Sequence, residues 1–216
     1  MLVVEYTKEY PISVISHIDL LRVFHRIIRR VGIKVAYSQG FNPHMKVFFS
    51  PPAPLGLETT CEYVVIETEE KGDEAFLSRF NDACPKGIKA TRIWQTEKNP
   101  NLAKMIDRAE YCFSGPNVSN IKLDGILNNP DYEIEYLDKT GECQVQKVGE
   151  MIFDIKSDGV DSIKAVLAFG NKNLRADRFF KYLCNKNNVD FYACVLKKVN
   201  ACVGEKLAVE YIGEFC

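Results

Sequence analysis

A run of apolar residues at helical spacing, closed by a glycine, constrains the fold of this chain more than any other feature. Within residues 18–31, apolar side chains recur every three or four positions, the spacing that places them on one face of an α-helix. They are Leu20, Phe24, Ile27 and Val31. Gly32 follows directly, and glycine readily adopts the left-handed conformation that ends helices. We therefore expect a helix over residues 18–31 whose apolar face packs on a core.

The segments around this helix have the patterns of strands and of a second helix. A helical pattern covers residues 73–84, and runs of apolar and β-branched residues predict strands elsewhere in the first 95 residues. The expected strands are residues 2–15, 33–38, 47–49, 61–68 and 88–95. In outline, the order is strand, helix, two strands, helix, strand, which is the split β-α-β unit of a ferredoxin-like domain.

The second half of the chain repeats this order less clearly. Strands are expected at residues 109–114, 132–137, 149–156, 162–169 and 189–203, and helices at 118–127 and 175–185. The polar, proline-containing stretch before them reads as a linker. We therefore expect an α+β fold of two ferredoxin-like (βαββαβ-type) halves with antiparallel sheets. The domains are residues 1–96 and 108–216, joined by a linker over 97–107.

The composition excludes several classes of protein. The 216 residues carry a net charge of −1, so no overall field draws the chain to nucleic acid or to a membrane. The start of the chain lacks the pattern of a secretory signal, and no apolar run is long enough to cross a bilayer. The eight cysteines form no Cys-x-x-Cys pair. We expect a cytoplasmic protein with reduced thiols, no metal site and no cluster of its own.

Charge is strongly segregated within this nearly neutral chain. Residues 20–57 contain no Asp or Glu but six Lys or Arg. Four arginines recur on the polar side of the first expected helix, at Arg22, Arg26, Arg29 and Arg30. The loop that follows supplies Tyr37, Gln39, Phe41, Asn42 and His44. Arginine binds phosphate well and aromatic rings stack on unpaired bases, so this segment predicts an RNA-binding face. The alternative is an ordinary solvated helix face.

A second, weaker basic cluster opens the late helix. Arg175 and Arg178 lie there together with Lys172 and Lys181. The first turn of a helix attracts anions, so we expect Arg175 and Arg178 to bind substrate or RNA. Asp177 lies within the cluster and reduces its net charge.

His17 is the candidate for catalysis. It precedes the first helix in the stretch Ile-Ser-His-Ile-Asp, and it could act as a general acid or base on RNA with Asp19 orienting its ring. The alternative is a capping role, in which His17 hydrogen-bonds the first helical turn and Asp19 is its partner. A single histidine favours the capping role.

Several blocks of sequence resemble one bacterial family. The blocks are ISHIDLLR at 15–22, AYSQGFNPH at 36–44, SPPAPLG at 50–56, Glu62-Tyr63, Ala109-Glu110-Tyr111 and Asn173-Leu174-Arg175. Together they resemble the radical SAM-linked family, an uncharacterised domain family encoded beside, or fused behind, radical SAM proteins. The family usually has proline where this chain has Met45 and Ala176.

The resemblance implies a partner and a context but no chemistry of the chain itself. It implies work with a separate radical SAM protein, which would carry the iron–sulfur cluster and S-adenosylmethionine. The gene neighbourhood of the family favours RNA or the ribosome as substrate. We therefore expect an accessory substrate-binding module without catalytic activity of its own. The alternatives are a protein-only adaptor of the radical SAM partner and a metal-independent RNA-processing or RNA-modifying enzyme that uses His17.

Overall fold

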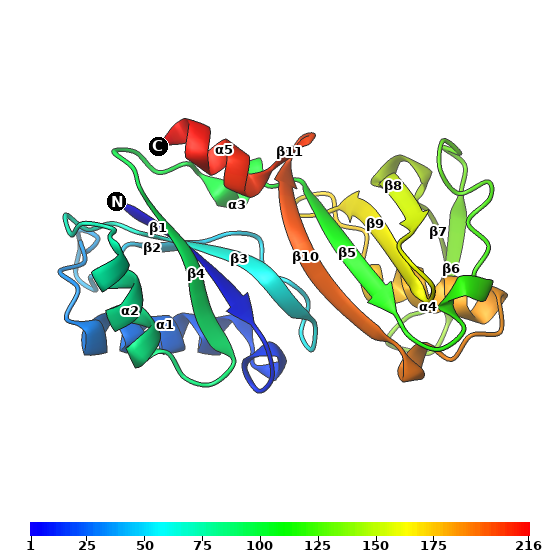
Figure 1. Ribbon diagram of the computed structural model, residues 1–216, viewed down its shortest axis with the longest axis horizontal. Helices are drawn as coiled ribbons and strands as arrows, with labels where there is room; N and C mark the ends of the chain where they lie inside the picture. The colour runs from blue at the N-terminus through cyan, green and yellow to red at the C-terminus, as the bar shows by residue number, and fades with distance from the viewer. The chain divides into compact units, whose positions relative to one another are not determined.

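The chain forms two compact units, described here for residues 1–216 from a computed structural model (Figure 1). The first unit comprises Met1–Ile106 and Ala201–Cys216, and the second comprises Asp107–Asn200. The first unit therefore gains a C-terminal segment that the sequence-based boundary at 108–216 assigned to the second half. This segment contains β11 (Lys206–Leu207) and α5 (Ala208–Phe215), and Ala208 and Ile212 of α5 are buried.

The sheet of the first unit is antiparallel and places its strands in the order β4-β1-β3, with β2 added beside β3. Its strands are β1 (Leu2–Lys8), β2 (Val47–Phe49), β3 (Glu58–Ile66) and β4 (Ile88–Gln95). The helices are α1 (His17–Val31) and α2 (Glu74–Ala83), with a short turn η1 (Ile12–Val14) before α1. This is the element order expected from the sequence.

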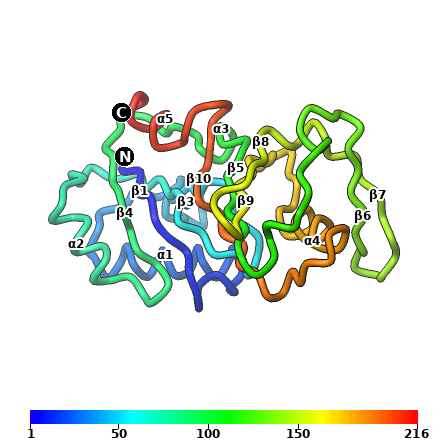
Figure 2. Tube along the Cα trace, turned by 45° about the vertical axis from the view of Figure 1, so that its right-hand side comes forward, coloured from blue at the N-terminus to red at the C-terminus, as the bar shows by residue number.

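The first helix follows the sequence pattern closely. Ser16 caps α1, since its side chain accepts a hydrogen bond from the Asp19 backbone N–H at 3.1 Å. Gly32 ends it with a φ of 78°, in the left-handed region. The buried face consists of Leu20, Phe24, Ile27 and Ile28. Together with Phe76 and Phe80 of α2, this face packs on alternate residues of β1 and β3, so both helices cover one side of the sheet (Figure 2).

Two local predictions for the first unit are wrong. Residues 33–38 form single bridges, Val35 to Thr68 and Tyr37 to Met45, and not a strand. The Lys34 N–H donates to Glu70 and its carbonyl accepts from Thr68 Oγ1, whereas the Ala36 N–H donates to the Glu67 carbonyl. Backbone pairing is thus confined to isolated positions. The predicted linker belongs to the first unit as far as Ile106, since it contains α3 (Leu102–Met105) and both Leu102 and Ile106 are buried.

The second unit combines a sheet, a detached hairpin and one helix. In the sheet, β10 (Val195–Val203), whose last three residues belong to the first unit, is followed by β5 (Arg108–Ser114), β9 (Ser162–Ala168) and β8 (Ile152–Ser157). The hairpin consists of β6 (Glu133–Leu137) and β7 (Cys143–Lys147), paired only with each other. The helix is α4 (Ala176–Lys186), and short turns occur at η2 (Val118–Asn120), η3 (Gly149–Met151) and η4 (Phe191–Ala193).

The prediction of a helix over 118–127 is wrong. The last strand begins at Val195 and not at residue 189. Only Val118–Asn120 form a helical turn. Ile121 is already extended, and Gly125 has a φ of 72°, so neither continues a right-handed helix. The fold is α+β with antiparallel strand pairing, as expected, whereas the ferredoxin-like description of the two halves is not confirmed. None of the helices has the length and apolar character needed to cross a membrane.

Candidate functional site

The outer face of α1 carries four exposed arginines, which we call the arginine ridge: Arg22, Arg26, Arg29 and Arg30. Helical spacing brings them to one side because residues three or four apart are neighbours on a helix surface. Arg22 is paired with Asp19 at 2.9 Å, and both side chains of this pair are exposed. The other three arginines make no ion pair. The ridge thus presents cationic groups to solvent.

The segment after α1 forms a closed loop over residues 37–45, which we call the aromatic loop. Its base is fixed by the Tyr37–Met45 bridge and by the Ser38 N–H, which donates to the His44 carbonyl at 2.9 Å. The His44 N–H in turn donates to Ser38 Oγ at 2.9 Å. Near the tip, Gly40 has a φ of 123°, and the Phe41 side chain is fully exposed. Tyr37, Gln39, Asn42 and His44 are exposed as well.

The base of the aromatic loop lies beside α1. The pKa of the half-buried His25 imidazole on α1 is lowered, first by burial and then by the positive charges of Arg29 and His44. A charge on His44 acts on His25 in this way only if the loop and the helix are near each other. Met45, at the base of the loop, also packs in the same buried core as Ile27 and Ile28 of α1, so the base of the loop lies near this helix.

His17 occupies the first position of α1 and contacts an aromatic ring. Its imidazole lies edge-on to Phe49 of β2, with ring centroids 5.4 Å apart. Phe49 also contacts Phe24 of the helix, at 5.1 Å. The Asp19 carboxylate accepts from Ser16 Oγ at 2.7 Å and pairs with Arg22, so these are the partners that hold it. A catalytic role for His17 stays a prediction.

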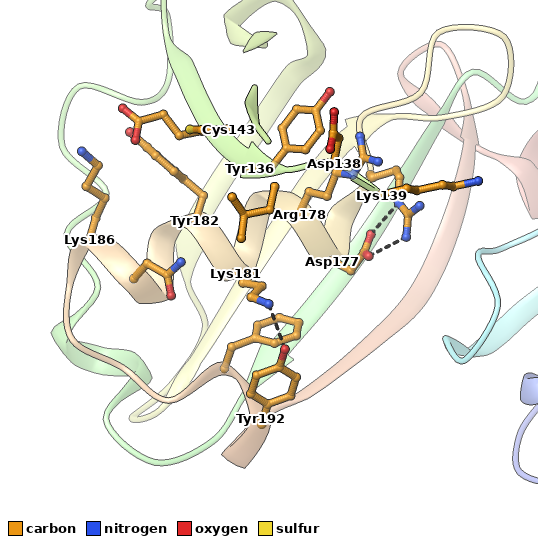
Figure 3. Close-up of a pocket in the computed structure, with 15 residues that line it drawn as sticks. Tyr136, Asp138, Lys139, Cys143, Asp177, Arg178, Lys181, Tyr182, Lys186 and Tyr192 are labelled. Carbon is orange, nitrogen blue, oxygen red and sulfur yellow. Dashed lines mark hydrogen bonds and ion pairs between the residues drawn. The ribbon is translucent and has the colours of Figure 1, made fainter. Parts of the chain in front are cut away.

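The second predicted cluster lies at a pocket of about 640 Å³ in the second unit (Figure 3). Its walls come from β6 with the turn after it, from the exposed side of α4 and from η4. Arg175 lines it and binds Asp177 through two hydrogen bonds of 2.7 and 3.1 Å. Arg178 also lines it, and its guanidinium carbon lies 4.1 Å from the centre of the Tyr136 ring.

Sequence reasoning missed most of this pocket. Besides the two predicted arginines, it is lined by Tyr136, Lys139, Lys181, Tyr182, Lys186 and Tyr192. The α4 residues among them follow helical spacing from Arg178, so the signal was present on that helix. A strand over 132–137 was expected, but nothing in the sequence indicated that it would contact α4, because that contact joins residues far apart in the chain.

Comparison with known proteins gives one family and several structural likenesses. The sequence pattern described as "Uncharacterized protein conserved in bacteria (DUF2344)" matches residues 1–176. The chain belongs to the DUF2344 family. Among solved structures, the one titled "Cas6 (TTHB231) product complex" is matched over 90% of this chain and 98% of that chain, with 11% sequence identity and a TM-score of 0.26. None of the curated proteins matches.

The DUF2344 match covers the first candidate surface completely and the second only in part. It contains the whole of the arginine ridge and the aromatic loop, together with His17, Asp19 and Arg175. It ends at Ala176, so Arg178 and the rest of α4 lie beyond it. The structure has no group of three or more His, Cys, Asp or Glu side chains placed to hold a metal ion.

Proposed function

We propose that this chain is an RNA-binding module that holds single-stranded RNA on the arginine ridge and the aromatic loop. The observation that carries the proposal is the fully exposed ring of Phe41, close in sequence to a run of exposed arginines and within a segment free of acidic residues. A single exposed ring is ordinary on a protein surface, but a ring at a loop tip combined with exposed arginines suits a ligand that carries both bases and phosphates.

The chemistry of this face matches unpaired RNA. Arg26, Arg29 and Arg30 supply guanidinium groups for phosphates, free of competing carboxylates. Phe41 and Tyr37 supply rings on which bases stack, a contact worth about 1–3 kcal/mol per base. Gln39, Asn42 and His44 carry exposed polar groups able to hydrogen-bond base edges. Bases inside a duplex offer no free face for such stacking, which favours single strands.

We further infer that the module works in the cytoplasm beside a separate radical SAM enzyme. The support is the resemblance of its motifs, YSQGFNPH at 37–44 above all, to proteins encoded with such enzymes. In this arrangement the partner carries the iron–sulfur cluster and S-adenosylmethionine, and this chain contributes substrate binding without a cofactor of its own.

The decisive experiment measures how salt affects RNA binding. Fluorescence polarisation with a labelled 12-nucleotide RNA of mixed sequence is read at low and at moderate salt for the wild type and for Arg26→Ala/Arg29→Ala/Arg30→Ala. We expect salt-sensitive binding in the wild type. In the triple variant the dependence of log affinity on log salt should become shallower by about 2, since each phosphate contact on single strands contributes about 0.7.

The matched control removes three exposed lysines elsewhere in the same unit, as Lys71→Ala/Lys86→Ala/Lys89→Ala. It changes the net charge equally and should leave the affinity within about threefold of the wild type. If both triple variants lose the same RNA affinity, net charge alone explains the loss and the proposal is contradicted. Absence of RNA binding at low salt, together with a stoichiometric complex with a radical SAM protein, would instead establish the adaptor alternative.

A further inference from the structure

Three of the five cationic side chains that line the pocket of the second unit lie next to an aromatic ring (Figure 3). Arg178 lies over Tyr136 at 4.1 Å, and Lys186 lies 5.4 Å from the ring centre of Tyr182. Lys181 donates a hydrogen bond to the Tyr192 hydroxyl at 2.8 Å and lies 5.0 Å from that ring. The rings come from β6, α4 and η4, so the pocket holds flat apolar surfaces and positive charges side by side.

Two of the three acidic residues that line the pocket are engaged by neighbouring groups, whereas Glu135 is an exposed carboxylate on β6. Asp177 is held by Arg175. Asp138 accepts from the N–H and hydroxyl of Thr140 and from the Gln144 side chain, within the turn of its own hairpin. These hydrogen bonds lower the pKa of Asp138, so its carboxylate is ionised, and they already use its oxygen atoms as acceptors. Arg178, Lys181 and Lys186 each lie next to a ring, and Asp138 and Asp177 are held by other groups.

The geometry points to a nucleotide as the ligand of this pocket: a base stacked among Tyr136, Tyr182 and Tyr192, with its phosphate on Arg178 and Lys181. A nucleotide is the common ligand that joins a flat ring to an anionic group through a short linker, the combination that the lining offers. An acidic peptide would use the cations but leave the rings uncovered. The volume of about 640 Å³ falls within the range of pockets that enclose small ligands.

This site is separate from the proposed RNA face. It lies in the second unit, whereas the arginine ridge and the aromatic loop lie in the first. The same nucleotide chemistry is offered by a free mononucleotide and by one nucleotide of a single-stranded RNA. A free mononucleotide and a nucleotide within RNA thus present the same groups to the pocket, and titrations with AMP and with an RNA oligomer distinguish them.

The experiment titrates the full chain with AMP by isothermal calorimetry, with adenosine and inorganic phosphate as partial ligands. We expect saturable AMP binding, with adenosine and phosphate each at least about tenfold weaker because each makes half of the contacts. Arg178→Ala should weaken AMP by about tenfold, through loss of the phosphate contact. Arg178→Lys keeps a positive charge, so its affinity for AMP should lie between those of the wild type and Arg178→Ala. This intermediate affinity would exclude misfolding as the cause of the loss.

The control is Lys122→Ala, an exposed lysine of the same unit outside the pocket, which should bind AMP as the wild type does. A hexamer of adenylate is then titrated in the Arg26→Ala/Arg29→Ala/Arg30→Ala background, so that binding to the first unit does not contribute. If the hexamer binds more tightly than AMP and Arg178→Ala weakens its binding, the site is assigned to RNA. If the hexamer binds as tightly as AMP or more weakly, the site is assigned to the free nucleotide.

Three results would overturn the inference. They are failure of both AMP and the hexamer to bind at about millimolar concentration, phosphate binding as tightly as AMP, and Arg178→Ala behaving like Lys122→Ala. Failure of the proposed function is recognised separately, because it concerns binding of the 12-nucleotide RNA and its loss in the arginine variants of the first unit.

Discussion

The imidazole of His17 meets the ring of Phe49 edge to face, with 5.4 Å between centroids and 85° between planes. This contact joins the first turn of α1 to β2. Phe49 continues the contact to Phe24 in the core, so His17 closes one end of an aromatic row. Its position is thus accounted for by packing, and packing and catalysis predict different behaviour on substitution.

For His17, we expect His17→Ala to lower the free energy of unfolding by about 1 kcal/mol, since aromatic pairs contribute roughly 0.5–1.5 kcal/mol. His17→Phe keeps an edge contact with Phe49 and should recover most of this loss in urea unfolding. RNA affinity should be unchanged in His17→Phe. The packing explanation fails if His17→Phe is fully stable and yet abolishes an RNA-processing or RNA-modifying activity of the wild type.

Substitution of Phe41 should weaken RNA binding without changing the stability of the fold. The side chain is fully exposed, so Phe41→Ala should leave the unfolding midpoint unchanged. Loss of a stacking ring should weaken single-stranded RNA binding by about 1–3 kcal/mol. Leu55→Ala, at another exposed apolar residue of the acid-free segment, is the control and should leave both properties unchanged. An unaltered RNA affinity in Phe41→Ala would remove the aromatic loop from the proposed interface.

For His25, the structure predicts a loss of stability in mild acid. Burial, Arg29 and His44 hold the pKa of His25 below its usual value in the folded chain. As the pH falls through about 6.5, the unfolded chain binds a proton that the folded chain does not, so folding weakens until the folded pKa is also passed. His25→Gln should therefore lose less stability than the wild type between about pH 7.5 and about pH 5.5.

The same histidine provides a test of the contact between the loop and the helix. The chain has three histidines, so their ring protons can be followed individually by NMR. His44→Gln removes a positive charge near His25 and should raise the pKa of His25 toward its usual value. An unmoved His25 titration in His44→Gln would show that the base of the aromatic loop is not beside α1.

For the cysteines, reactivity with a thiol reagent should follow burial. Cys143 and Cys216 are both exposed, and Cys143 should react first because burial raises the pKa of Cys216. Burial raises the pKa of Cys84 and of Cys184 to about 12, so neither forms thiolate at neutral pH and both should react only after unfolding. Cys143→Ser should remove the fastest phase. A fast phase that persists in this variant would contradict the assignment.

Local sequence signals were sufficient for the first helix and its surface. Gly32 ends α1 as expected, and the apolar spacing identified Leu20, Phe24 and Ile27 as core. These features depend on hydrogen bonds and spacing within one segment, which neighbouring residues decide by themselves. The position of the arginine ridge follows in the same way, because a helix with one buried face must expose the other.

Segments whose form depends on distant partners could not be predicted. Residues 33–38 have strand composition, yet Glu70 and Thr68 take hydrogen bonds of Lys34 that a strand would need. The turn-rich stretch after Val118 has apolar residues at helical spacing, but Ile121 is extended and Gly125 has a positive φ, so no helix continues through it. Such outcomes depend on contacts far along the chain or on individual dihedral angles, which a pattern of polarity does not record.

The sequence by itself determined where the charges, rings and helix ends of this protein lie along the chain. Only the tertiary structure decided which of them meet. It placed His44 near His25, joined the C-terminal α5 to the first unit and set Tyr136 of the detached hairpin over Arg178 of α4. The physical reason is that spacing along a helix is fixed by local backbone geometry, whereas contacts between distant segments depend on how their buried faces pack.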